Sequence, residues 1–340
     1  MQHATASNGG VTDDSSKRDE KYELWKALTA AAFARAVATA WSLPLLQLFV
    51  KAQLNVLGRH LFLESQIKES EVAEAEGGPT FGPGVGLTRD SSTNSFAYEL
   101  PSKLTLRCQQ KFLSYAEFLS QHGIETIVHE ARNAATRVLK DVDLRKPCSE
   151  NHFRGLLARL SATLEDVAST KGWARLLLPQ IGGIGGGATG GAQSPTGAWR
   201  FLVTQGTELG LTTSVDAVLD EGDLQVLEAL LNETRRVLST RAFDEAVRCS
   251  AAQTLRMVGG NAAASVYTVG NTMDPGSERD EMGEMGENGV PAAKLVPAVA
   301  AAALRVLDQP GETISAVAAL PEVEALCARV YDVTGTVGRW

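Results

Sequence analysis

Three glycines, Gly185, Gly187 and Gly190, are the first candidates for chemistry, because they match the GxGxxG pattern of a dinucleotide-binding turn. In such a turn, backbone N–H groups approach a pyrophosphate between a strand and a helix. Here Pro179 and an isolated Ile181 precede the glycines instead of an apolar strand, and the surrounding IGGIGGGATGGAQSPTG is of low complexity. We therefore interpret the run as a flexible linker and predict no cofactor.

Histidine and acidic residues offer a second set of candidates, for a metal site. His129 is followed by a glutamate as in a zinc-protease helix, but the residue four positions later is Asn133, so the second ligand is missing. The acidic pairs at 13–14 and 141–143 lack the further carboxylates of a magnesium-diphosphate site and are more typical of a solvated surface. The sequence predicts no bound metal.

Cysteine chemistry is not indicated either. The four cysteines are far apart with no CxxC pair, which favours reduced thiols in a cytosol-like compartment; they are Cys108, Cys148, Cys249 and Cys327. No nucleophile elbow, P-loop or local Cys-His signature is present in the sequence. We therefore predict that the protein is not an enzyme.

Two aromatic residues, Tyr22 and Trp25, begin a long helical pattern and are candidates for partner recognition. On spacing alone, Trp25 fits a buried core position, since tryptophans are highly buried on average. Lys21, Lys26 and Lys51 would place positive charge near this end if the helices return on each other. That arrangement would suit an amphipathic partner helix carrying acidic residues.

Helices must position these residues. In residues 21–63, apolar side chains recur at helical spacing at Trp25, Leu28, Ala32 and Ala36, and a period of two is almost absent from the whole chain. Further helical stripes begin near Leu104, Ile124, Phe153, Leu224, Phe243, Pro291 and Pro321. The pattern predicts an all-α fold, a single elongated bundle of long helices spanning residues 21–336. A disordered leader covers residues 1–20, and glycine-rich mobile loops lie near 66–98, 180–198 and 270–289.

Composition bounds the classes of partner. With 340 residues, 44% of them hydrophobic, the chain can bury a substantial core. A net charge of -8 without a basic cluster argues against a nucleic-acid surface. The most apolar run, residues 43–50, is shorter than the roughly 20 residues of a membrane-spanning helix, and residues 1–20 contain no apolar targeting segment. We therefore predict no membrane span.

Three blocks of sequence resemble the peroxisomal biogenesis factor 3 (peroxin-3) family, in its soluble cytosolic domain. The first block is KYELWKAL, continuing through FARAVATAW to VKAQLNVLGRHLFL. The second is LLNETRRVLSTRAFDEAV, and the third is PAAKLVPAV, with a weaker match in QQKFLSYAEFL. The resemblance extends over most of residues 21–333. It implies a single bundle of long helices, in agreement with the periodicity.

The resemblance implies a docking receptor on the cytosolic face of the peroxisomal membrane. Such a receptor binds the N-terminal amphipathic helix of peroxisomal biogenesis factor 19, the import receptor for peroxisomal membrane proteins, in an apolar groove with a tryptophan at its centre. By position in the motif, Trp25 is that tryptophan. The same match assigns Lys21, Tyr22 and Leu28 to the first helix of the groove, Leu61 to its wall, and Lys294 as a charge for an acidic ligand residue. We expect a monomer.

One departure and two alternatives accompany this prediction. Family members carry an N-terminal membrane anchor and a further helix, which residues 1–20 do not resemble, so the chain alone is expected to be soluble. The first alternative is an all-α adaptor whose tryptophan is buried and whose partners are unrelated. The second is a helical enzyme that holds a lipid-like substrate in a bundle cavity.

Overall fold

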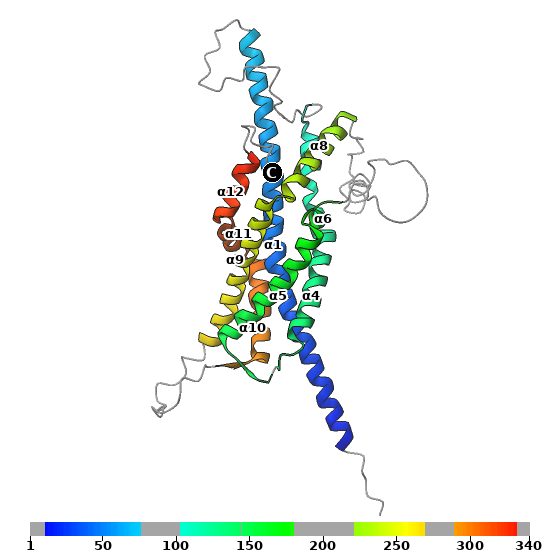
Figure 1. Cartoon of the computed structure of the whole chain (residues 1–340), viewed down its shortest axis with the longest axis vertical. Coiled ribbons are helices and arrows are strands. Elements are labelled where there is room, and N and C mark those ends of the chain that lie inside the picture. The colour runs from blue at the N-terminus through cyan, green and yellow to red at the C-terminus, as the bar shows by residue number, and fades with distance from the viewer. Residues whose placement is uncertain (1–10, 76–102, 144, 180–220, 269–288, 332–340) are drawn as a thin grey trace, which may run out of the picture. The chain divides into compact units, whose positions relative to one another are not determined.

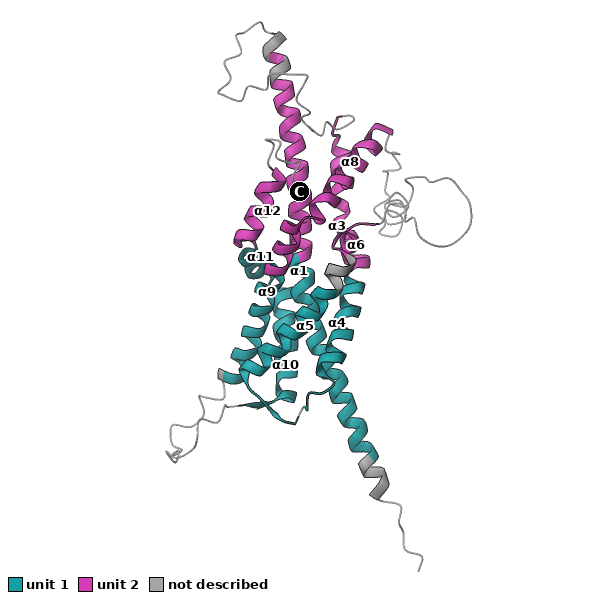
Figure 2. Ribbon diagram, viewed as in Figure 1, with its two compact units in different colours: residues 1–44, 124–170, 250–317 teal, residues 45–123, 171–249, 318–340 magenta. Residues whose placement is uncertain are grey.

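The computed structural model describes residues 11–75, 103–143, 145–179, 221–268 and 289–331. Within these ranges the chain is helical apart from two strands of two residues each and the connecting turns, so the all-α fold class is confirmed (Figure 1). The residues group into two compact units (Figure 2). Unit 1 contains residues 1–44, 124–170 and 250–317, and unit 2 contains 45–123, 171–249 and 318–340. The single domain over residues 21–336 stays a prediction.

Helix α1 (Val11–Ala75) is longer at both ends than the sequence indicated. Residues 11–20, expected in a disordered leader, form its first turns, and residues 66–75, expected in a loop, form its last. Near its end, Lys68 Nζ lies 2.9 Å from Glu64 Oε1, four residues earlier, and such pairs support a helix. The predicted loop at 180–198 lies outside the described residues, as does the loop at 270–289 except for Gly289.

Residues 16–69 of α1 are long and apolar enough to cross a membrane, judged by length and composition. Of the most apolar window, however, 67% is buried inside the structure, and the core helix of a soluble protein meets the same criterion. The absence of a membrane span therefore stays a prediction.

Unit 1 is built around the first half of α1. Several of its alanines are buried, Ala36 and Ala40 completely, and small side chains let neighbouring helices approach closely. Phe33 packs edge-to-face on Phe153, with ring centroids 5.9 Å apart. Besides α1, the unit contains α4 (Ile124–Leu139), β1 (Pro147–Cys148), α5 (Glu150–Lys171), the second half of α9 (Arg241–Ala263), η2 (Ala264–Thr268), β2 (Val290–Pro291), α10 (Ala292–Asp308) and α11 (Pro310–Ala318), which ends at the unit boundary.

Unit 2 contains the second half of α1, α2 (Leu106–Ser114), α3 (Ala116–Phe118), η1 (Leu119–Gly123), α6 (Ala174–Leu177), α8 (Glu221–Leu238), the first part of α9 and α12 (Pro321–Tyr331). Its core confirms the predicted apolar stripe, since Leu104, Cys108, Phe112, Tyr115 and Leu119 are all buried.

Gly123 ends the π-helical turn η1, and α4 begins at the next residue. A side-chain Cβ at this residue would lie 2.3 Å from the carbonyl oxygen of Leu176, so only glycine lets α6 pack directly on the backbone. In the same unit, the indole N–H of Trp173 donates to Asp244 Oδ1 at 2.9 Å, which fixes the turn before α6 on α9.

Candidate partner-binding site

The first turns of α1 carry an exposed apolar strip, which we define as Leu24, Trp25 and Leu28. Trp25 is 42% exposed, Leu24 66% and Leu28 52%. Figure 2 shows this part of α1 running past the ends of α4 and α10 within unit 1. The interpretation of Trp25 as a core residue is therefore wrong, and with it the buried tryptophan of the adaptor alternative.

The strip lies on the same face of α1 that is buried from about residue 29 onward. Ala32 and Ala36 follow Trp25 and Leu28 at helical spacing, and both are buried. Thr29, one turn after Trp25, is also buried, and its hydroxyl donates to the Trp25 carbonyl oxygen at 2.8 Å. The apolar face of α1 therefore passes without interruption from the core of unit 1 to the surface.

Charge is distributed unevenly around this part of α1. Lys21 precedes Trp25 by four residues and Leu28 by seven, so it shares their face, and Arg18 precedes Trp25 by seven. Asp19, Glu20 and Glu23 are also exposed. Their spacing places them roughly 90° or more around the helix from the strip's centre. Lys21 therefore shares the face of the strip, and Glu20, four residues before Leu24, lies at its edge.

Tyr22 is half-buried and lies beneath a cation. The guanidinium carbon of Arg145 is 5.0 Å from the centroid of the Tyr22 ring, a cation–π geometry. Arg145 belongs to the connection between α4 and β1, and its side chain is exposed. The sequence did not single out Arg145, because its contact with Tyr22 depends on tertiary packing. Leu24 was also missed, although its spacing of four from Leu28 is a signal that could have identified it.

Lys294 lies in the first turn of α10 and is exposed. The two strands connect it to the same end of unit 1, because Pro147 pairs with Pro291 and Cys148 with Val290. Arg145 precedes this pairing by two residues, and Lys294 follows it by three. The β1–β2 pairing therefore joins the segment that carries Arg145 to the start of α10, which carries Lys294. The role of Lys294 as a ligand charge stays a prediction.

Leu61 lies in unit 2, in a separate exposed group. Its neighbour Phe62 is 44% exposed, and Tyr331 of α12 is also exposed, its ring close to Gly58. A Cβ added to Gly58 would lie 3.3 Å from Tyr331 Cε2. The assignment of Leu61 to the partner-binding site stays a prediction.

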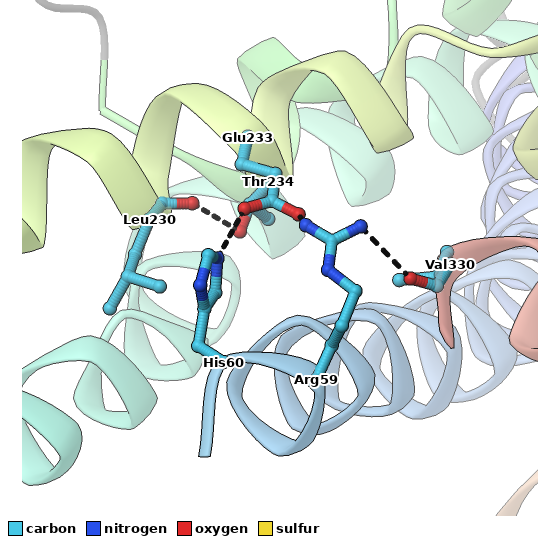
Figure 3. A network of polar contacts seen from close by, with 6 residues as sticks. All are labelled: Arg59, His60, Leu230, Glu233, Thr234 and Val330. Atoms are coloured by element: carbon cyan, nitrogen blue, oxygen red, sulfur yellow. Dashed lines mark hydrogen bonds and ion pairs between the residues drawn. The ribbon is translucent and has the colours of Figure 1, made fainter. Parts of the chain in front are cut away.

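A buried polar network in unit 2 joins two of the family-like sequence blocks (Figure 3). Glu233 of α8 forms an ion pair with Arg59 of α1, and its second oxygen lies 2.7 Å from His60 Nε2. Arg59 also donates to the carbonyl oxygen of Val330 in α12 at 3.3 Å. All three charged or titratable side chains are at least 91% buried, so the network fastens α1 to α8 and α12 in the interior.

Burial controls the protonation of this network. Desolvation, together with the positive charge of Arg59, lowers the pKa of His60 to about 4. Neutral His60 can then donate from Nε2 to Glu233, and the cluster carries no net charge when Arg59 and Glu233 are ionised. Glu233 contacts both Arg59 and His60, and Arg59 also donates to backbone, so we interpret the network as a structural link between helices.

The described residues do not assemble the other chemical candidates into a metal site or a disulfide. The glycines at 185–190 lie outside the described residues. His129 is exposed on α4, and among the described residues no group of three or more His, Cys, Asp or Glu side chains could hold a metal ion. The four cysteines form no disulfide bond with one another.

A protein-family model named Peroxin-3 matches residues 2–332, nearly the whole chain. The chain belongs to the peroxin-3 family, as its three sequence blocks predicted. Peroxisome biogenesis protein 3-2 of Arabidopsis thaliana is 25% identical over 233 residues, covering 68% of this chain and 50% of that protein. Peroxisome biogenesis protein 3-1 of the same plant is 26% identical over 159 residues, covering 47% and 38%.

A yeast relative extends the comparison. The peroxisomal membrane protein PEX3 of Komagataella phaffii is 24% identical over 168 residues, covering 48% of this chain and 31% of that protein. The chain thus spans half or less of the length of each of these relatives.

Proposed function

We propose that the protein is a docking receptor at the peroxisomal membrane. It binds the N-terminal amphipathic helix of peroxisomal biogenesis factor 19 and so supports the insertion of peroxisomal membrane proteins and peroxisome assembly. The observation that carries this proposal is the exposed strip of Leu24, Trp25 and Leu28, which continues the buried face of α1 beyond its intramolecular neighbours. An apolar helix face of this kind gains stability when a second helix covers it.

The residue types of the strip suit a helix as partner. An amphipathic helix presents apolar side chains at three- and four-residue spacing, which matches the spacing of Leu24, Trp25 and Leu28. Exposed tryptophan is the side chain most enriched among binding hot spots, because it buries a large area at little entropic cost. Lys21 and Lys294 supply charges that favour acidic residues on the guest helix.

Family membership supports the cellular setting. The relatives are named as peroxisome biogenesis and peroxisomal membrane proteins. We place this chain at the cytosolic face of that membrane, as a monomer that acts by binding rather than by catalysis. The strip contains no nucleophile, acid or base, and the buried titratable groups of Figure 3 are occupied by one another.

The proposal is tested by calorimetric titration of the chain with a peptide containing the import receptor's N-terminal amphipathic helix. We expect a sub-micromolar Kd for this peptide. A control peptide of identical composition, with its apolar residues moved off a single face, should bind at least tenfold more weakly, because it cannot cover the strip. Equal affinity for both peptides, or no heat of binding with either, would contradict the proposal.

A further inference from the structure

We propose that Arg145 is a specificity-determining residue of the docking site, where it binds a carboxylate on the partner helix. The inference rests on the function proposed above and adds a requirement on the partner. The guest helix must carry an aspartate or glutamate at its edge, beside the apolar side chains that cover Trp25.

The contact with Tyr22 leaves hydrogen-bond donors of Arg145 available to a partner. The guanidinium carbon lies 5.0 Å from the ring centroid, and a cation–π contact of this kind does not use up the five N–H donors of a guanidinium. A planar guanidinium can donate two parallel hydrogen bonds to one carboxylate, which a lysine ammonium cannot do. Because the side chain is exposed, a carboxylate can approach it without opening the fold.

Arg145 stands next to the strip. Tyr22 and Trp25 are three residues apart on α1 and are therefore neighbours on the helix surface. Lys21 lies on the other side of Trp25, four residues before it. A guest helix that covers Trp25 would thus have a cation on each side, Lys21 and Arg145. Of these two, Arg145 is held by a contact with an aromatic ring, that of Tyr22.

Hydrogen bonds and close packing fix the position of the segment that carries Arg145. Its own backbone N–H donates to Asp143 Oδ1 at 3.0 Å, and the pairing of β1 with β2 begins two residues later. The Tyr267 hydroxyl donates to the Cys148 carbonyl oxygen at 2.8 Å. Gly289 approaches Pro147 so closely that a Cβ there would lie 2.7 Å from the proline Cβ. The guanidinium is therefore held in place before the partner arrives, which lowers the entropic cost of binding.

The test compares Arg145 variants in titrations with the amphipathic receptor peptide at low and high salt. We expect Arg145→Ala to weaken binding about tenfold at 50 mM salt, the loss typical of a charge-assisted hydrogen bond. Arg145→Lys should recover only part of the affinity, because it restores the charge but not the paired donors. Tyr22→Leu, which removes the ring below the guanidinium, should weaken binding in the wild type and much less in Arg145→Ala.

Arg132→Ala is the matched control, since it removes one exposed positive charge from α4 in the same unit and should leave Kd within twofold. The inference is overturned if Arg145→Ala binds within twofold of wild type, or if Arg132→Ala loses as much as Arg145→Ala. The outcome in which wild type binds and Arg145→Ala is unaffected removes this inference and leaves the proposed function intact. Absence of binding by wild type removes both.

Discussion

Trp25→Ala is expected to weaken binding of the amphipathic receptor peptide by at least about 2 kcal/mol, or about 30-fold in Kd, as for an interface hot spot. The indole is the largest side chain of the strip, and truncation to alanine removes the large aromatic surface that a guest helix could cover beside Leu24 and Leu28. Because Trp25 is 42% exposed and outside the core, the thermal midpoint of unfolding should stay close to that of wild type. Titration calorimetry and a thermal melt of the same sample measure both quantities.

Leu307→Ala provides the control for Trp25→Ala. Leu307 is 47% exposed on α10 of the same unit, away from the first turns of α1, so its truncation should leave Kd unchanged. A loss below about 0.5 kcal/mol for Trp25→Ala, within the range of neutral surface substitutions, would remove Trp25 from the site. A large fall in the melting temperature would instead assign Trp25 a structural role.

Glu233→Ala is expected to lower the free energy of unfolding by about 3–5 kcal/mol, the largest effect on stability that we predict. The substitution leaves Arg59 buried with one backbone carbonyl as its remaining partner, and it removes the acceptor of the His60 ring. A buried cation without its counter-ion is far more costly than a lost surface contact. Urea unfolding followed by circular dichroism should show the midpoint shifted to lower urea.

Glu228→Ala, on the exposed side of the same helix, removes an identical charge and should cost less than about 0.5 kcal/mol. The double variant Arg59→Met with Glu233→Leu should be more stable than Glu233→Ala alone, because it removes both charges together. If Glu233→Ala and Glu228→Ala have the same urea midpoint, the buried network does not stabilise unit 2.

Much of the helical framework could be predicted from periodicity. The stripes beginning at Leu104 and Phe153 are buried as expected, and Ser149 caps α5 through its hydroxyl, 3.3 Å from the His152 N–H. The ends of α1 could not be predicted, because its polar first and last turns lack an apolar stripe. Residues 11–20 and 66–75 contain no proline or glycine that would interrupt a helix.

The family-like blocks acquire a physical meaning in the structure. Gln53, in the QLN piece, donates from Nε2 to the Phe112 carbonyl oxygen at 2.7 Å, and Arg59 and His60 reach Glu233 in the second block. These contacts join residues far apart in sequence, so spacing could not reveal them. The polar residues of the family-like blocks in unit 2 therefore form buried contacts between its helices.

At the candidate partner-binding site, sequence alone predicted less than it did for the core. Trp25 fits a core position by spacing, and only its place beyond the neighbouring helices of unit 1 makes it a surface residue. Arg145 carried no signal at all, since nothing in its local sequence indicates an aromatic ring beneath it. Sequence could therefore nominate the helix that carries the site, but the composition of the site depends on how the chain returns to that helix.

Amide hydrogen exchange, measured with and without the amphipathic receptor peptide, tests most directly whether the exposed first turns of α1 receive the guest helix. The backbone N–H groups of residues 17–28 should exchange rapidly in the free protein, where few side chains cover them, and slowly in the complex. Protection confined to residues 54–68 of unit 2, with no change at residues 17–28, would contradict the account.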